Sequence, residues 1–168
     1  MYTWQFVKML YTSDRLGLSR FVTMQNHYNL IYREEEREMI PLCQAEGVRI
    51  IPWSPLARGF LAGNRRQQDI GETNRAKTDR FAHQFYYQDA DFAIVDRVSK
   101  VAQKRGTSNA QVALAWLLHQ PGVTAPIIGA SKMPQLEDTV KALDLKLDAE
   151  ELESLAEPYQ PHPVLGHL

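Results

Sequence analysis

The chain has very little cysteine: among its 168 residues only Cys43 carries a thiol. One cysteine excludes an intrachain disulfide, and by itself it excludes a cysteine-based zinc cluster. Such a composition suits a reducing compartment, so we expect a cytoplasmic protein.

The sequence also lacks an excess of charge and any long apolar run. Nineteen basic residues against 20 acidic ones leave a net charge of -1. No overall field attracts nucleic acid or an anionic membrane surface, so we expect neither as a partner. No apolar run approaches the length of about 20 residues that crosses a bilayer, and Lys8, Asp14 and Arg15 interrupt any signal-peptide core. An apolar content of 44% predicts one soluble globular domain over residues 1–168.

No close spacing of histidines supports a metal site, so we interpret the five histidines as structural residues. They are His27, His83, His119, His162 and His167. The acidic run at 34–36 is interpreted as a solvated helix start that complements the helix dipole.

Three short apolar segments predict strands, at residues 21–25, 48–53 and 125–129. Apolar periodicity and capping residues predict helices over about 1–16, 34–45, 89–104, 109–118, 131–143 and 148–157, and residues 62–90 read as a long loop. Strands alternate with helices through links long enough for right-handed crossovers. This predicts an α/β fold with a parallel sheet.

The strand at 48–53 ends abruptly in a loop that carries an aromatic, a hydroxyl and a cationic side chain. Ligand sites of parallel α/β proteins lie beyond the carboxyl ends of their strands. Trp53 offers a flat apolar face beside Ser54, and Pro52 and Pro55 restrict the loop in advance. The loop therefore predicts a site for a planar, phosphate-bearing cofactor.

A second candidate segment lies where the strand at 125–129 meets the next helix. Free amides and the helix dipole favour a bound phosphate at such a junction, and Lys132 adds a positive charge. Ser131 is the expected helix cap. Taken alone, this pattern is more often structural than functional.

Three motifs in this order resemble the aldo-keto reductases, in particular the bacterial, fungal and potassium-channel β-subunit branch. The motifs are Met-Gln-Asn-His-Tyr-Asn-Leu at 24–30, Trp-Ser-Pro-Leu-Ala-Arg-Gly at 53–59, and Ile-Ile-Gly-Ala-Ser at 127–131 continuing through Gln-Leu-Glu-Asp at 135–138. The resemblance implies a parallel (β/α)8 barrel of the TIM type. It also implies that residues 1–168 form only the C-terminal half of an NADP-dependent oxidoreductase domain.

The resemblance also implies a role for each matching residue. Gln25 would hydrogen-bond the nicotinamide carboxamide and Trp53 would stack on the nicotinamide ring, while Arg75 would close over the cofactor. The pyrophosphate would be wrapped by Ser54, Pro55, Leu56, Ala57 and Arg58.

The far end of the cofactor would lie against the third motif. The adenosine ribose and its 2′-phosphate would contact Gly129, Ser131, Lys132 and Gln135, which favours NADPH over NADH. The adenine would face Asp138 and Thr139, where the family often has Glu-Asn, and Asn64 replaces a common lysine.

No residue matches the family's catalytic Asp, Tyr, Lys and His, which lie on the first half of the barrel. Residues 1–6 look like an internal stretch of the family, as in a truncated gene, so we assign no catalytic residue. In the complete family the substrate is a small-molecule carbonyl compound. Three alternatives stay open: the cofactor-binding half of a reductase, a non-catalytic nucleotide-binding or interaction module, and a nonfunctional remnant. In each, open barrel edges predict self-association or pairing.

Overall fold

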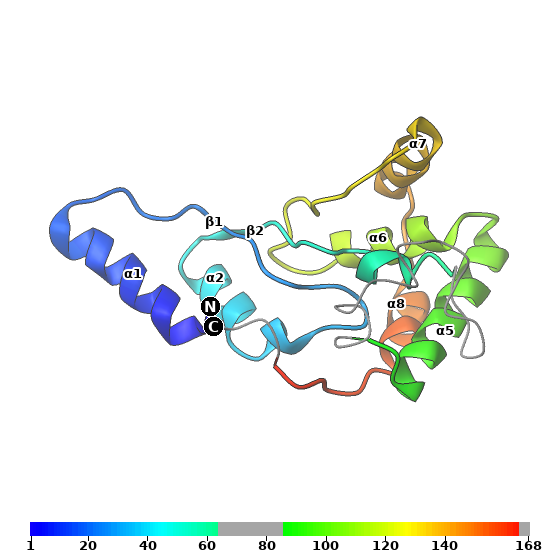
Figure 1. Cartoon of the computed structure of the whole chain (residues 1–168), viewed down its shortest axis with the longest axis horizontal. Coiled ribbons are helices and arrows are strands. Elements are labelled where there is room, and N and C mark those ends of the chain that lie inside the picture. Colours follow the sequence, from blue (N-terminus) through cyan, green and yellow to red (C-terminus); the bar gives the residue numbers. More distant parts are fainter. Residues whose placement is uncertain (64–85, 165–168) are drawn as a thin grey trace.

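The structure is a computed structural model, and it describes residues 1–63 and 86–164. Figure 1 shows helix α1 (Thr3–Leu16) at one end of the molecule and helices α5 (Asp89–Arg105), α6 (Asn109–Leu118) and α8 (Ala149–Ala156) at the other. The short strands β1 (Thr23–Met24) and β2 (Arg49–Ile50) lie between them.

The two strands pair in parallel, as the alternation of strands and helices predicts. Thr23 pairs with Arg49 and Met24 with Ile50. A bridge between His27 and Trp53 keeps the same offset along the chain. The carboxyl ends of both strands therefore run side by side into the loops that follow them.

The third predicted strand, at 125–129, is wrong, because this segment makes only isolated bridges to the chain around β2. Val123 pairs with Ile50 and Ile127 with Trp53, so the segment carries one more residue than the chain opposite it. Pro52 and Pro126 have no N–H to donate within this stretch. The missing donors and the extra residue interrupt a continuous ladder.

Helix ends agree closely with the capping residues of the sequence. Gly17 and Gly106 end α1 and α5 in the left-handed conformation, with φ of 65° at both. At the start of α8, Asp148 Oδ1 accepts from the Glu151 N–H at 2.9 Å and Glu151 Oε2 accepts from the Asp148 N–H at 3.1 Å. These boundaries are set by local chemistry.

The helix predicted over 34–45 is divided into a 3-10 turn, η1 (Glu34–Glu36), and helix α2 (Met39–Ala45). Pro41 is tolerated because it lies in the first turn of α2, where amides have no helical acceptor. The interpretation of the acidic run as solvated is wrong for Glu34 and Glu35, which are 5% and 6% exposed.

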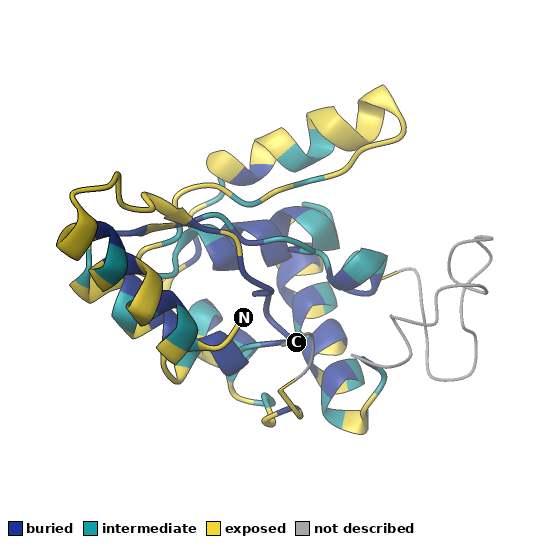
Figure 2. Ribbon diagram, turned by 60° about the vertical axis from the view of Figure 1, so that its left-hand side comes forward, coloured by how far each residue is buried: buried dark blue, intermediate teal, exposed yellow. Residues whose placement is uncertain are grey.

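Helix α7 (Met133–Val140) and the 3-10 turn η3 (Lys141–Leu143) follow the third motif. No residue of α7 is buried, and Figure 2 shows it as a largely exposed rod along one side of the molecule. Its N-cap is Lys132, so the prediction of Ser131 as the cap is wrong. The side chain of Gln135, one turn into the helix, performs the capping.

The apolar core is continuous from α1 to α8, and within it α5 packs against α6 and α8. Trp116 of α6 is 2% exposed and belongs to this core. Within residues 1–63 and 86–164, no helix combines the length and the apolar character needed to cross a membrane.

Candidate functional site

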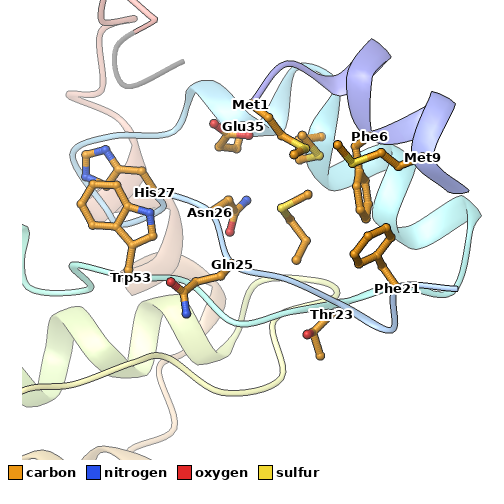
Figure 3. Close-up of a pocket in the computed structure, with 12 residues that line it drawn as sticks. Met1, Phe6, Met9, Phe21, Thr23, Gln25, Asn26, His27, Glu35 and Trp53 are labelled. Carbon is orange, nitrogen blue, oxygen red and sulfur yellow. The ribbon is translucent and has the colours of Figure 1, made fainter. Parts of the chain in front are cut away.

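Gln25, His27 and Trp53 lie together at the carboxyl ends of the two strands. His27 lies two residues beyond Gln25, and a backbone bridge places Trp53 beside His27. All three line a cavity of about 340 Å³, which Figure 3 shows between the strands and α1. The sequence paired Gln25 with Trp53, and the structure brings both to this cavity.

The Trp53 indole forms one layer of a three-ring stack. Its ring centroid lies 4.2 Å from that of His27, and the planes are inclined by 14°. The opposite face of His27 meets Tyr32 at 4.2 Å and 12°. Figure 3 shows the imidazole lying over the indole. One face of Trp53 is thus occupied by protein, whereas the partly buried side chain also reaches the cavity.

Asn29 and Tyr86 fix the edges of this stack. His27 Nε2 and the Tyr86 hydroxyl are 2.7 Å apart. Asn29 Nδ2 donates to the Ser54 carbonyl at 3.0 Å, and Asn29 Oδ1 accepts from the Ile31 and Tyr32 amides, each at 2.9 Å. One buried amide therefore ties the loop after β1 to the residue that follows Trp53.

Burial sets the protonation of the groups in the stack. Desolvation, with the positive charges of His162 and Arg58, lowers the pKa of His27 to about 3. Desolvation raises the pKa of Tyr86 to about 12, although its hydrogen bonds to Ser54 and Asn29 act in the opposite direction. Both side chains are neutral at physiological pH.

The loop after Trp53 has an unusual backbone. Ser54, Ala57 and Arg58 adopt φ of 55°, 47° and 56°, although none of them is glycine. Such left-handed residues cost free energy and gather at ligand sites, and successive backbone N–H groups in turns can form a concave anion-binding site. Pro55 is buried and Leu56 packs against the core, so these two predicted contacts anchor the loop.

The third motif begins directly beside Trp53. The Ile127 N–H donates to the Pro52 carbonyl at 2.8 Å. Ser131 is four residues further along the chain, which limits its backbone distance from Ile127 to about 14 Å. The two predicted ends of the site are therefore on neighbouring segments. Gly129 between them is exposed, with open space around it.

The start of α7 is closed by its own side chains. Gln135 Oε1 accepts from the Ser131 N–H at 3.0 Å, the Ser131 hydroxyl at 3.2 Å and the Lys132 N–H at 3.2 Å. The amides predicted to bind phosphate are thus engaged by Gln135.

The two residues predicted to face adenine also make internal bonds. Asp138 accepts from the Ser108 hydroxyl and from Gln111 Nε2, both at 2.6 Å, and so ties α7 to the start of α6. Thr139 donates to the Leu136 carbonyl at 2.9 Å. Arg75, predicted to close over the cofactor, lies outside the described residues.

Sequence reasoning missed the packing of the C-terminal tail behind the stack. Tyr159 and the His162 N–H donate to the buried carboxylate of Glu34, and His162 Nε2 lies 3.0 Å from Asp91 Oδ1. Burial opposes a charge on His162, but Asp91 outweighs it and raises the pKa of the imidazole. The only hint in the sequence was the acidic run at 34–36, which contains the buried acceptor Glu34.

The part of the chain described here contains no group of three or more His, Cys, Asp or Glu residues able to hold a metal ion. Comparison with known proteins identifies the family of this chain. The family model described as "Aldo/keto reductase family" matches residues 2–160.

Fungal relatives match over nearly the whole chain. A Schizosaccharomyces pombe protein, named provisionally as an aryl-alcohol dehydrogenase, is 44% identical over 100% of the chain. An aldo-keto reductase of Fusarium vanettenii is 45% identical over 99%, and the versiconal hemiacetal acetate reductase of Aspergillus parasiticus is 42% identical over 98%. The chain spans 47%, 44% and 48% of these relatives, about half their length. The match to the family model over most of its length shows that this chain belongs to the aldo/keto reductase family.

Proposed function

We propose that this chain is the NADP(H)-holding half of a carbonyl reductase built on a (β/α)8 barrel. One observation carries the proposal. The Trp53 indole, backed on one face by His27, lines the same cavity as Gln25 and lies beside the segment that leads to Ser131. A flat apolar surface and an amide suit the nicotinamide ring and its carboxamide, and a helix start suits a phosphate of the same dinucleotide.

The residues present fit the nicotinamide end best. Gln25 is exposed and Trp53 partly so, and their common cavity leaves both accessible to a planar carboxamide. The left-handed turn through Arg58 suits the pyrophosphate. At the far end Gln135 must exchange its bonds to Ser131 and Lys132 for bonds to phosphate, so we expect that end to rearrange on binding.

NADPH, when bound, supplies a hydride to an aldehyde or ketone carbonyl. The residues of this chain bind and orient the nicotinamide, and so they contribute to the reaction by holding the reactive ring in place. None of them matches the family's catalytic tetrad, and stabilising the carbonyl oxygen falls to residues outside this chain. We therefore expect the chain alone to bind cofactor and to reduce no carbonyl compound.

Titration with NADPH followed by tryptophan fluorescence tests the binding step. We expect saturable quenching that disappears in Trp53→Ala. The same change at the exposed Trp4, which lies on α1 outside the cavity lining, is the control and should leave binding unchanged. Absence of saturable binding in the unaltered chain would overturn the proposal.

Turnover assays separate the alternatives that the sequence left open. Saturable binding with no NADPH oxidation in the presence of an aldehyde supports a cofactor-holding module. Turnover in a preparation freed of other reductases would contradict the assignment of no catalytic residue. A chain that neither binds nor turns over would be the remnant.

A further inference from the structure

We propose that His27 is a positioning residue for Trp53: it pins the indole from one side and leaves only the opposite face for a planar ring of a ligand. The part of this inference that concerns the ligand rests on the proposed function. The part that concerns the indole rests on the geometry of the stack alone.

The contact between the two rings is close and nearly parallel. Centroids 4.2 Å apart with planes 14° apart leave no room for another ring between them. The constant offset along β1 and β2 explains the contact, because His27 and Trp53 are direct neighbours across a parallel pair. A nicotinamide that stacks on Trp53 must therefore lie on the face away from His27.

His27 is itself held from behind. Tyr32 is fully buried and stacks on the second face of the imidazole at 4.2 Å and 12°. Asn29 Oδ1 accepts from the Tyr32 amide, and the ring of His162 in the C-terminal tail lies 6.3 Å from the Tyr32 ring. The imidazole cannot retreat from the indole without moving Tyr32 and the tail.

The edge of the imidazole is fixed as well. The Tyr86 hydroxyl is 2.7 Å from His27 Nε2, and Asn29 Nδ2 donates to the same hydroxyl at 3.3 Å. These contacts define the rotation of the ring, whereas stacking alone would define only its plane. Two independent constraints thus set the surface against which Trp53 rests.

The imidazole acts as an uncharged flat ring in this position. Desolvation, followed by the positive charges of His162 and Arg58, lowers its pKa and keeps it neutral. An aromatic ring without charge can replace it in the stack, whereas a small side chain cannot. This property gives the inference a conservative variant.

The experiment compares His27→Ala with His27→Phe in the full chain, with two readouts. The first is the indole N–H resonance of Trp53, assigned by its loss in Trp53→Phe and observed without cofactor. The second is the dissociation constant for NADPH. His119→Ala is the matched control, because His119 lies at the end of α6, where its Nδ1 is 2.7 Å from the Ala115 carbonyl of the same helix.

We expect His27→Ala to shift the Trp53 resonance and to weaken NADPH binding about tenfold. His27→Phe should restore binding to within about threefold, and the control should change neither readout. Circular dichroism confirms that the variants fold, and His27→Phe keeps the test valid if the alanine variant does not.

An unmoved Trp53 resonance in both His27 variants would overturn the inference, as would unchanged NADPH affinity in a chain that binds it. If the unaltered chain binds no NADPH while His27→Ala still moves the resonance, the proposed function fails and the positioning of Trp53 by His27 stands.

Discussion

The two predicted ends of the cofactor site are built in different ways. At the Trp53 end, three residues of the loop after β1 and one distant residue are buried: His27, Asn29 and Tyr32, with Tyr86. At the Ser131 end, α7 contains no buried residue and its start is capped by its own first turn. The side chains of the buried end are already held in place, whereas a ligand at the exposed end would have to replace internal hydrogen bonds. We therefore expect the binding energy at the two ends to have different origins.

The largest change in stability is expected from Asn29→Ala, at the buried end. The change removes the side-chain acceptor of the Ile31 and Tyr32 amides, and it removes one of two donors to the Ser54 carbonyl, which also accepts from the Ala57 N–H. We expect the free energy of unfolding to fall by about 4 kcal/mol. Chemical denaturation measures it. Asn29→Asp keeps the oxygen acceptor and should lose clearly less, so equal losses in the two variants would contradict this role.

Next in size is the pH dependence of Glu35, which lines the cavity. Desolvation, with a smaller contribution from Glu34, raises its pKa from 4.5 to about 7, although the N-terminal charge acts in the opposite direction. The folded state thus binds this proton more tightly than the unfolded state, and stability is lost as pH rises from about 4.5 to 7.

Glu35→Gln should remove that loss. We expect little change at pH 4 and a gain of about 3 kcal/mol at pH 8, measured by denaturation at both values. Glu137→Gln on the exposed helix α7 is the matched control and should leave the free energy of unfolding unchanged at both pH values. A gain for Glu35→Gln that is equal at both pH values would contradict the assignment.

A third prediction concerns the open edge of β1. Backbone N–H groups of β2 and the residues after it donate to the Val22, Met24 and Asn26 carbonyls on one edge of the β1 chain. The side chains of Val22 and Phe21 are 72% and 50% exposed. Among the described residues no group hydrogen-bonds to the buried side-chain amide of Asn26, a residue that also lines the cavity. β1 pairs only with β2 among the described strands, and such an edge beside apolar side chains favours pairing with a second copy of the chain.

Val22→Lys should weaken this self-association about tenfold in sedimentation equilibrium, equivalent to about 1.4 kcal/mol. Val140→Lys makes the same replacement on exposed α7 and should have no such effect. A chain that is monomeric at every concentration would remove the basis of the prediction.

The smallest effect is expected at the far end of the site. Gln135→Ala removes the acceptor for three donors, but Ser131 and Lys132 are exposed and water can replace it. We expect a loss of only about 0.5–1 kcal/mol of stability. A loss as large as that of Asn29→Ala would show that the two ends do not differ as described.

Local chemistry explains which parts of the fold could be predicted from the sequence. Gly17, Gly106 and the Asp148–Glu151 pair act within one helical turn, and the helices they bound are found where expected. The strand at 125–129 could not be predicted correctly, because its pairing depends on which residues stand opposite it. Pro52 belongs to a segment more than 70 residues earlier, and its missing N–H contributes to the interruption together with that of Pro126 and the extra residue.

The sequence by itself determined the family, through three motifs, and the residues that flank the site. Only the tertiary structure decided what surrounds them. Burial of Glu34 and Glu35, the stack on Trp53 and the engagement of Asp138 by α6 all join residues distant in sequence. Motifs record the identity of side chains, whereas desolvation and ring contacts depend on which segments are packed against each other. That is why the motif contained His27, while its place behind the indole emerged only from the fold.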